Sequence, residues 1–186
     1  MGRRYSEIRD ELKAFIDEQK MFFVATAAAD GRINVSPKGL DSLRILGRNR
    51  VMWLNLTGSG NETAAHVREL DRMTLMFCAF EGNPLILRLY GHARAIHPQD
   101  AGWETSYALF NPLPGARQIF DMQVDLVQTS CGMGVPLYDY TGDRKQLIDW
   151  ASRKGEAGLK KYRAEKNRTS LDGKPTHIMG PATEET

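Results

Sequence analysis

Strand-like segments joined by tight turns are the feature that most constrains how this chain can fold. Phe22–Ala28 and Ile33–Lys38 flank Asp30-Gly31, a dipeptide typical of two-residue hairpin turns. Residues 73–80 and 85–97 flank a second turn that contains Gly-Asn. Because a hairpin pairs its two strands antiparallel, these segments predict an antiparallel sheet rather than a parallel sheet with crossover helices.

Further elements extend this pattern along the 186 residues. Apolar periodicity and turn residues predict more strands at 41–50, 51–56 and 122–129 and helices at 6–19, 61–70, 99–110, 143–154 and 156–167, the last two split by Gly155. The segment 73–80 is apolar at nearly every position, which predicts a central strand covered on both faces. We therefore expect an α+β, mainly β protein built on an antiparallel sheet or barrel.

Composition is that of an ordinary globular domain. Hydrophobic residues make up 41% of the chain, and the net charge of +2 comes without a basic block that carries aromatic residues, so no nucleic-acid partner is expected. No apolar run approaches the roughly 20 residues that span a bilayer, and the first residues lack a signal peptide's apolar core. We expect a cytoplasmic protein without membrane contact. The two cysteines are too few for a disulfide framework.

A glycine-rich loop between a strand and a helix is the strongest functional signal. Residues 57–60 read Thr-Gly-Ser-Gly, and helical composition follows. Such a loop presents free backbone N–H groups and the positive end of the helix dipole to an anion. Ser59, Asn61 and Thr63 add side-chain donors, although Ser59 or Asn61 could equally serve only as an N-cap.

Two cations would complete a phosphate site with this loop. Lys38 follows Pro37 at the end of a strand, and Arg88 lies on one face of the strand 85–97. A Rossmann fingerprint is disfavoured because Thr63 stands where the third glycine is required. A P-loop is excluded because no Gly-Lys-Ser/Thr follows the glycines.

Other reactive residues point to no defined chemistry. His92 and His97 are five apart in one strand and so point to opposite faces, and we predict no metal site. Cys78 fits a core position, whereas Cys131 lies in a glycine-rich loop without a base nearby. No catalytic residue is identified, and Tyr90, His92 and Cys131 are the candidates to test.

Several motifs together resemble the pyridoxamine 5′-phosphate oxidase-like family of FMN-binding split barrels. They are Phe-Phe-Val-Ala-Thr-Ala from Phe22, Asn-Val-Ser-Pro-Lys-Gly from Asn34 and Thr-Gly-Ser-Gly-Asn-Glu-Thr-Ala-Ala-His from Thr57. Residues 73–80 and 87–93 continue the match in the same order. Residues 130–136 and 167–173 resemble the tail of one uncharacterised branch, not that of the true oxidase.

This resemblance implies a fold and an assembly. The fold is a six-stranded antiparallel split β-barrel with peripheral helices and a helical C-terminal extension. Residues 1–138 would form the FMN-binding barrel, 139–175 a helical extension packed on it, and 176–186 a flexible tail. The family further implies a homodimer with two FMN sites at the subunit interface.

The resemblance also implies a function and a set of binding residues. The protein would be an FMN-binding flavoprotein and an oxidoreductase that acts on a small molecule. The alternative is a non-enzymatic module that binds flavin, deazaflavin or haem, or that senses redox state. Motif positions assign cofactor binding to Asn34, Ser36, Lys38, Trp53, Asn55, Ser59, Asn61, Glu62, Thr63 and Arg88.

Two departures from the family pattern stand out. The family's phosphate loop often carries Ser-Arg-Lys, whereas this chain has Asn61-Glu62-Thr63, which removes two cations and adds an acid. The true oxidase also has a C-terminal segment with Arg and His that binds its substrate. This chain has no counterpart of that segment, so oxidation of vitamin B6 is not expected.

Overall fold

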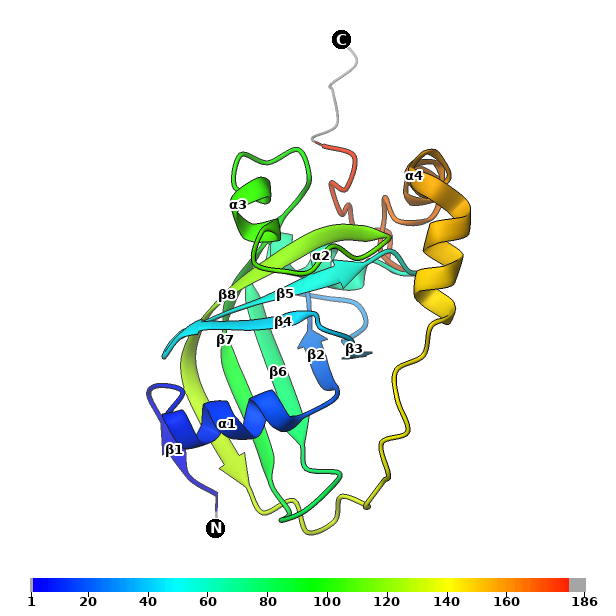
Figure 1. Cartoon of the computed structure of the whole chain (residues 1–186). Helices are drawn as coiled ribbons and strands as arrows, with labels where there is room; N and C mark the ends of the chain where they lie inside the picture. Colours follow the sequence, from blue (N-terminus) through cyan, green and yellow to red (C-terminus); the bar gives the residue numbers. More distant parts are fainter. Residues whose placement is uncertain (1, 181–186) are drawn as a thin grey trace.

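The computed structural model describes residues 2–180 and contains eight strands and four helices (Figure 1). The strands are β1 (Arg4–Tyr5), β2 (Phe22–Thr26), β3 (Asn34–Lys38), β4 (Leu43–Gly47), β5 (Arg50–Leu56), β6 (Arg72–Cys78), β7 (Ile86–Ile96) and β8 (Ala116–Ser130). The helices are α1 (Asp10–Glu18), α2 (Glu62–Glu69), α3 (Trp103–Tyr107) and α4 (Gln146–Lys166).

All strands belong to one antiparallel sheet. Its order is β3-β2-β6-β7-β8-β5-β4, and β1 pairs with β8 beside this path. The 15 residues of β8 pair with β7 on one side and with β5 on the other. The sheet curls on itself, so that β4 and β5 cross in front of β6 and β7 (Figure 1). This is the predicted split barrel, with more strands than the six expected.

Aromatic stacking fills the inside of the curled sheet. The rings of Trp53 and Phe120 stack with their centroids 4.5 Å apart, and Phe22 packs edge-on against Trp53 at 6.3 Å. Leu12 and Ile16 of α1 close one end of this core. Burial of such large apolar side chains is the main favourable term in folding.

Several predicted element bounds differ from the structure, and three of them differ most clearly. β8 begins at Ala116, six residues before the predicted Met122, because its first half carries buried polar residues that hide its strand pattern. α1 begins at Asp10 rather than after Ser6, because Arg9 is extended and the backbone N–H of Ile8 donates to the Arg48 carbonyl at 2.7 Å. α3 spans only Trp103–Tyr107, shorter than the predicted 99–110.

The outer face of the sheet is less covered than the apolar composition of residues 73–80 predicts. In β6, Leu75 and Phe77 are buried, whereas Thr74 and Met76 on the opposite face are only half-buried. Next to this face, Ile33 and Val35 remain 75% and 61% exposed. The expectation that residues 73–80 are covered on both faces is therefore wrong for a single chain.

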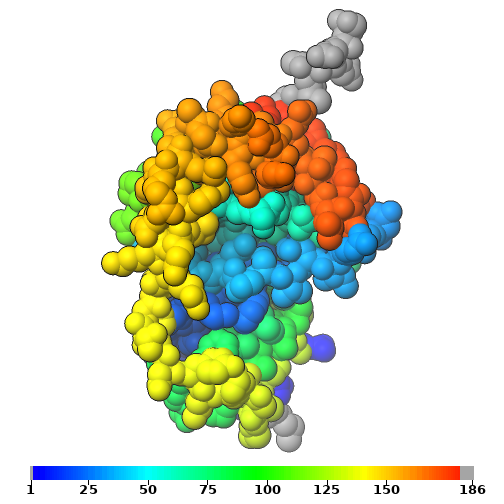
Figure 2. Space-filling view, turned by 90° about the vertical axis from the view of Figure 1, so that its right-hand side faces the viewer, coloured from blue at the N-terminus to red at the C-terminus, as the bar shows by residue number. Residues whose placement is uncertain are grey.

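The C-terminal region wraps around the barrel. Residues 131–145, here called the connector, leave β8 and run along one side of the molecule to α4 (Figures 1 and 2). Gly155 has φ 62° and breaks α4, as the prediction of two helices required. Of the predicted flexible tail, 181–186 lie outside the described residues, while Thr176 and Ile178 are buried. Within residues 2–180, no helix combines the length and the apolar character needed to cross a membrane.

Candidate functional site

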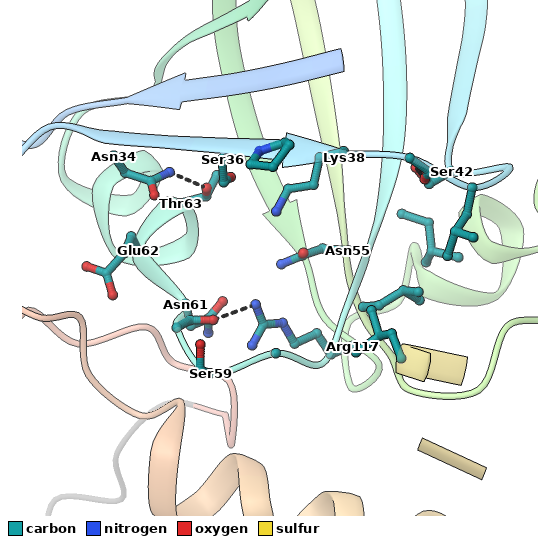
Figure 3. A pocket seen from close by; sticks show the side chains of 18 residues that line it. Asn34, Ser36, Lys38, Ser42, Asn55, Ser59, Asn61, Glu62, Thr63 and Arg117 are labelled. Atoms are coloured by element: carbon teal, nitrogen blue, oxygen red, sulfur yellow. Dashed lines mark hydrogen bonds between the residues drawn. The ribbon is translucent and has the colours of Figure 1, made fainter. Parts of the chain in front are cut away.

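A cavity of about 320 Å³ lies between β3, β5 and the loop that leads into α2 (Figure 3). It brings together eight of the ten predicted binding residues, namely Asn34, Ser36, Lys38, Asn55, Ser59, Asn61, Glu62 and Thr63. The alternation of β3 places its three members on the same face, because side chains two apart in a strand point the same way. Strand β3 is at the edge of the sheet, where Pro37 is tolerated.

Lys38 is a cation that is largely removed from water. Its ammonium group lies 5.3 Å from the centroid of the Trp53 ring, which favours the charged form weakly. Burial, with the nearby charge of Arg117, lowers the pKa of Lys38 to about 8. In the described part of the chain, no carboxylate forms a salt bridge with it.

Arg117 is the second cation in the cavity, and sequence reasoning missed it. Its side chain is 4% exposed, and its guanidinium donates to Asn167 Oδ1 at 2.8 Å and to the Gly60 carbonyl at 2.7 Å. With the Asn55 amide turned so that Oδ1 faces the guanidinium, Oδ1 also accepts from Arg117 Nε at 3.2 Å. These partners are neutral, so the positive charge is not cancelled.

Burial and the charge of Arg163 lower the pKa of Arg117, yet a guanidinium stays protonated near neutral pH. Two cations thus share a small cavity, and within residues 2–180 no carboxylate forms a salt bridge with either of them. Desolvation of an uncompensated charge is costly, and an anion that bridges both groups would relieve this cost.

The Glu62 carboxylate does not oppose such an anion. Its two oxygens accept the backbone N–H of Leu171 at 3.1 and 3.0 Å. Figure 3 shows it directed away from Lys38 and Arg117. Glu62, the acid by which this loop differs from the family's, therefore anchors the C-terminal segment at Leu171.

Asn61 occupies the N-cap position of α2 without capping it. Its side chain makes no capping hydrogen bond, and its Nδ2 instead donates to the Asn167 carbonyl at 3.2 Å. Asn61 Oδ1 is buried and has no partner among the described residues. The simple N-cap interpretation of Asn61 is wrong, so the first turn of α2 lacks a side-chain cap where it borders the cavity.

Asn167 connects this site to the C-terminal extension. It is fully buried at the end of α4, where Nδ2 donates to the carbonyls of Gly58 and Ser59 at 3.0 and 3.4 Å. Its Oδ1 accepts from Arg117. One amide therefore fixes both the glycine-rich loop and the guanidinium.

The remaining predicted residues lie elsewhere. Trp53 is buried in the core behind Lys38, and Arg88 donates to Ser130 Oγ at 3.1 Å, outside the cavity. Tyr90 donates to Gln128, and His92 pairs with Asp71, which raises the pKa of that histidine. Cys131 is exposed at the start of the connector. None of the three acid–base candidates lines the cavity.

Comparison with known proteins agrees with the predicted family and fold. The family described as pyridoxamine 5′-phosphate oxidase matches residues 8–131. The chain is 36% identical to the "Pyridoxamine 5'-phosphate oxidase family protein ustO" of Aspergillus flavus, over 92% of this chain and 76% of that one. It therefore belongs to the pyridoxamine 5′-phosphate oxidase family.

Solved structures share the fold at lower identity. A single-residue variant of HupZ from Group A Streptococcus is 22% identical with a TM-score of 0.55, and the match covers 66% of this chain and 99% of that one. A protein from Lactobacillus delbrueckii, described as a "putative pyridoxamine 5'-phosphate oxidase", is 19% identical with a TM-score of 0.53. That match covers 66% of this chain and 94% of the other.

Replacing Asn167 should lower the stability of the protein, because its side chain holds two parts of the site together. Asn167→Ala leaves Arg117 and the Gly58 carbonyl without their buried partner, so we expect the free energy of unfolding to fall by about 2–4 kcal/mol. Urea denaturation measures this loss. The matched control is Asn111→Ala, since Asn111 is exposed and its amide donates to the exposed Asp41 carboxylate, and it should change stability by less than about 0.5 kcal/mol. Equal, small effects of both substitutions would contradict the role of Asn167.

Proposed function

We propose that the cavity binds the phosphate group of FMN. The observation that carries this proposal is the pairing of half-buried Lys38 with buried Arg117 at the uncapped start of α2, where no carboxylate of the described residues neutralises either cation. A phosphate dianion carries the opposite charge and several acceptor oxygens, and helix starts together with Arg and Lys are its usual ligands. Membership of the family supports the same cofactor.

Each side chain of the cavity would then have a distinct role. Lys38 and Arg117 would hold the phosphate, and Arg117 would supply from β8 the charge that the family's loop supplies with Arg and Lys. Ser59 and Thr63 would add hydroxyl donors. Asn34, Ser36 and Asn55, from β3 and β5, also line the cavity and would hold the ribityl chain and the ring.

We propose further that the flavin makes the protein an oxidoreductase that acts on a small molecule. The bound isoalloxazine ring supplies hydride and electron transfer, and the protein supplies its orientation and its electrostatic surroundings. The unbalanced positive charge of the cavity would also favour an electron-rich ring.

Comparing FMN with riboflavin tests the phosphate site. Lys38→Met keeps the length of the side chain and removes its charge, and we expect FMN to bind roughly 10- to 100-fold more weakly. For riboflavin, which has no phosphate, the same substitution should reduce affinity by no more than about twofold. Fluorescence titration of the apoprotein measures both affinities. The matched control is Arg88→Met, a cation outside the cavity, which should leave FMN affinity unchanged.

The same preparations separate the competing functions. A colourless protein that takes up no flavin, or one with a haem or deazaflavin spectrum, would overturn the proposal. Bound FMN that no nicotinamide donor reduces would favour a non-enzymatic binding or sensing module over an oxidoreductase.

The lowered pKa of Lys38 predicts that affinity depends on pH. The ammonium group is charged below its pKa of about 8 and neutral above it, and phosphate binds the charged form. FMN affinity should therefore be highest below about pH 8 and fall above it, by up to about tenfold per pH unit. Titrations from about pH 7 to about pH 9.5 measure this, above the second pKa of the phosphate at about 6.

Lys38→Arg is the control for this effect. Its guanidinium stays charged over the whole range, so FMN affinity should remain nearly constant with pH. A wild-type curve that runs parallel to that of Lys38→Arg would exclude Lys38 as the titrating group.

We also propose that two chains associate through the outer face of the sheet. Exposed Ile33 and Val35 lie next to half-buried Thr74 and Met76 on this face, and no helix of the described chain covers it. Large exposed apolar patches on soluble proteins commonly mark contact surfaces. The proposal follows the assembly that the family resemblance implies.

Light scattering during size exclusion tests this association. We expect a mass of twice 20.9 kDa for the wild type and of 20.9 kDa for Val35→Glu, because a charge cannot be buried in the apolar contact. Leu46→Glu, also at an exposed apolar position but in β4 at the other end of the sheet, should remain a dimer. A monomeric wild type would refute the proposal.

A further inference from the structure

A second cavity, of about 610 Å³, lies beneath the connector. Figure 2 shows a hollow between the connector, in yellow, and the blue N-terminal part of the barrel. The cavity lies where α1 ends and β2 begins, and the connector closes its other side. Its lining is largely apolar and aromatic, with Met21, Phe23, Phe80, Pro136, Tyr138 and Tyr140.

The aromatic rings are held in place by contacts with the barrel. Tyr138 stacks on Phe80 with centroids 5.4 Å apart, and its backbone N–H donates to the Phe80 carbonyl at 2.9 Å. The backbone N–H of Tyr140 donates to Glu81 Oε1 at 3.3 Å. Both tyrosines nevertheless remain 62% and 47% exposed, so their rings are accessible to a ligand.

The charge of this cavity is opposite to that of the first. Three carboxylates line it, from Glu18, Glu81 and Asp139, against one amine, from Lys20. Among residues 2–180, none of these carboxylates takes part in a salt bridge. Glu18 also ends α1, whose last turn has no basic residue, so the negative end of the helix dipole adds to the carboxylate charge.

One aromatic ring of the cavity already contacts a cationic side chain of the protein. The Lys20 ammonium group lies 5.8 Å from the centroid of Tyr140, within the range of a cation–π contact. Aromatic faces surrounded by carboxylates attract organic cations, whereas an anion would be repelled by the three acids. A neutral apolar ligand would be attracted by the aromatic rings but not by the carboxylates.

We propose that this cavity binds a small organic cation, an alkylammonium or amine that bears an apolar or aromatic group. The apolar part packs between Phe23, Phe80 and Tyr138, and the positive charge faces Glu18, Glu81 and Asp139. The site is independent of the proposed flavin site, since no residue lines both cavities.

Calorimetric titration with benzyltrimethylammonium tests the proposal, with benzyl alcohol and benzenesulfonate as neutral and anionic analogues. The cation should bind at least about tenfold more tightly than either analogue, because only the cation gains from both the rings and the carboxylates. Binding should weaken as salt is added. Equal binding of all three compounds, or no binding of the cation, would overturn the proposal.

Matched variants locate the binding site. Tyr138→Ala and Glu18→Gln should each weaken binding of the cation about fivefold. Leu137→Ala and Asp17→Asn, their neighbours in sequence that do not line the cavity, should have less than about a twofold effect. Lys20→Met removes the competing cation and should strengthen binding. Equal effects of lining and control variants, or weaker binding by Lys20→Met, would contradict the assignment.

Inorganic phosphate separates this site from the first cavity. Saturating phosphate should not displace benzyltrimethylammonium, since the two ligands occupy different cavities. Mutual displacement would overturn the proposal, whether or not the protein binds FMN.

Discussion

The burial of Arg117 beside Lys38 is the constraint on which the arrangement of the site depends. Two like charges in a small cavity are unfavourable, and among the described residues the guanidinium donates hydrogen bonds to neutral oxygens alone, from Gly60, Asn55 and Asn167. Those oxygens come from three distant parts of the chain. The glycine-rich loop, β5 and the end of α4 must therefore all be in place before the Arg117 guanidinium can make these hydrogen bonds.

This arrangement gives the C-terminal extension a direct part in the site. Asn167 ends α4, and its amide holds the loop and Arg117 together. Nearby, Arg163 donates to Thr57 Oγ1 at 2.9 Å and to the Ala116 carbonyl at 2.9 Å, which fixes the beginning of the loop and of β8. Glu62 secures the following segment through Leu171. Residues that depart from the family's phosphate loop thus take part in contacts with this extension.

The elements that carry the fold were predictable where local patterns are strong. Asp30-Gly31 marked the β2–β3 hairpin, Gly155 marked the break in α4, and the alternation of β3 placed Asn34, Ser36 and Lys38 on one face. These signals need only the two-residue period of a strand or the conformational freedom of glycine. Prediction failed at the start of β8, because buried Arg117, Gln118 and Asp121 make that half of the strand look polar.

The sequence by itself determined the antiparallel sheet, the glycine-rich loop before α2 and the cation at the end of β3, since each follows from neighbouring residues. Only the tertiary structure decided which second cation joins Lys38. Strand position in the sequence predicts Arg88, yet the pairing of β8 with β5 brings Arg117 into the cavity and leaves Arg88 beside Ser130. The physical reason is that strand pairing across 60 or more residues is set by the packing of the whole core, which no local pattern encodes.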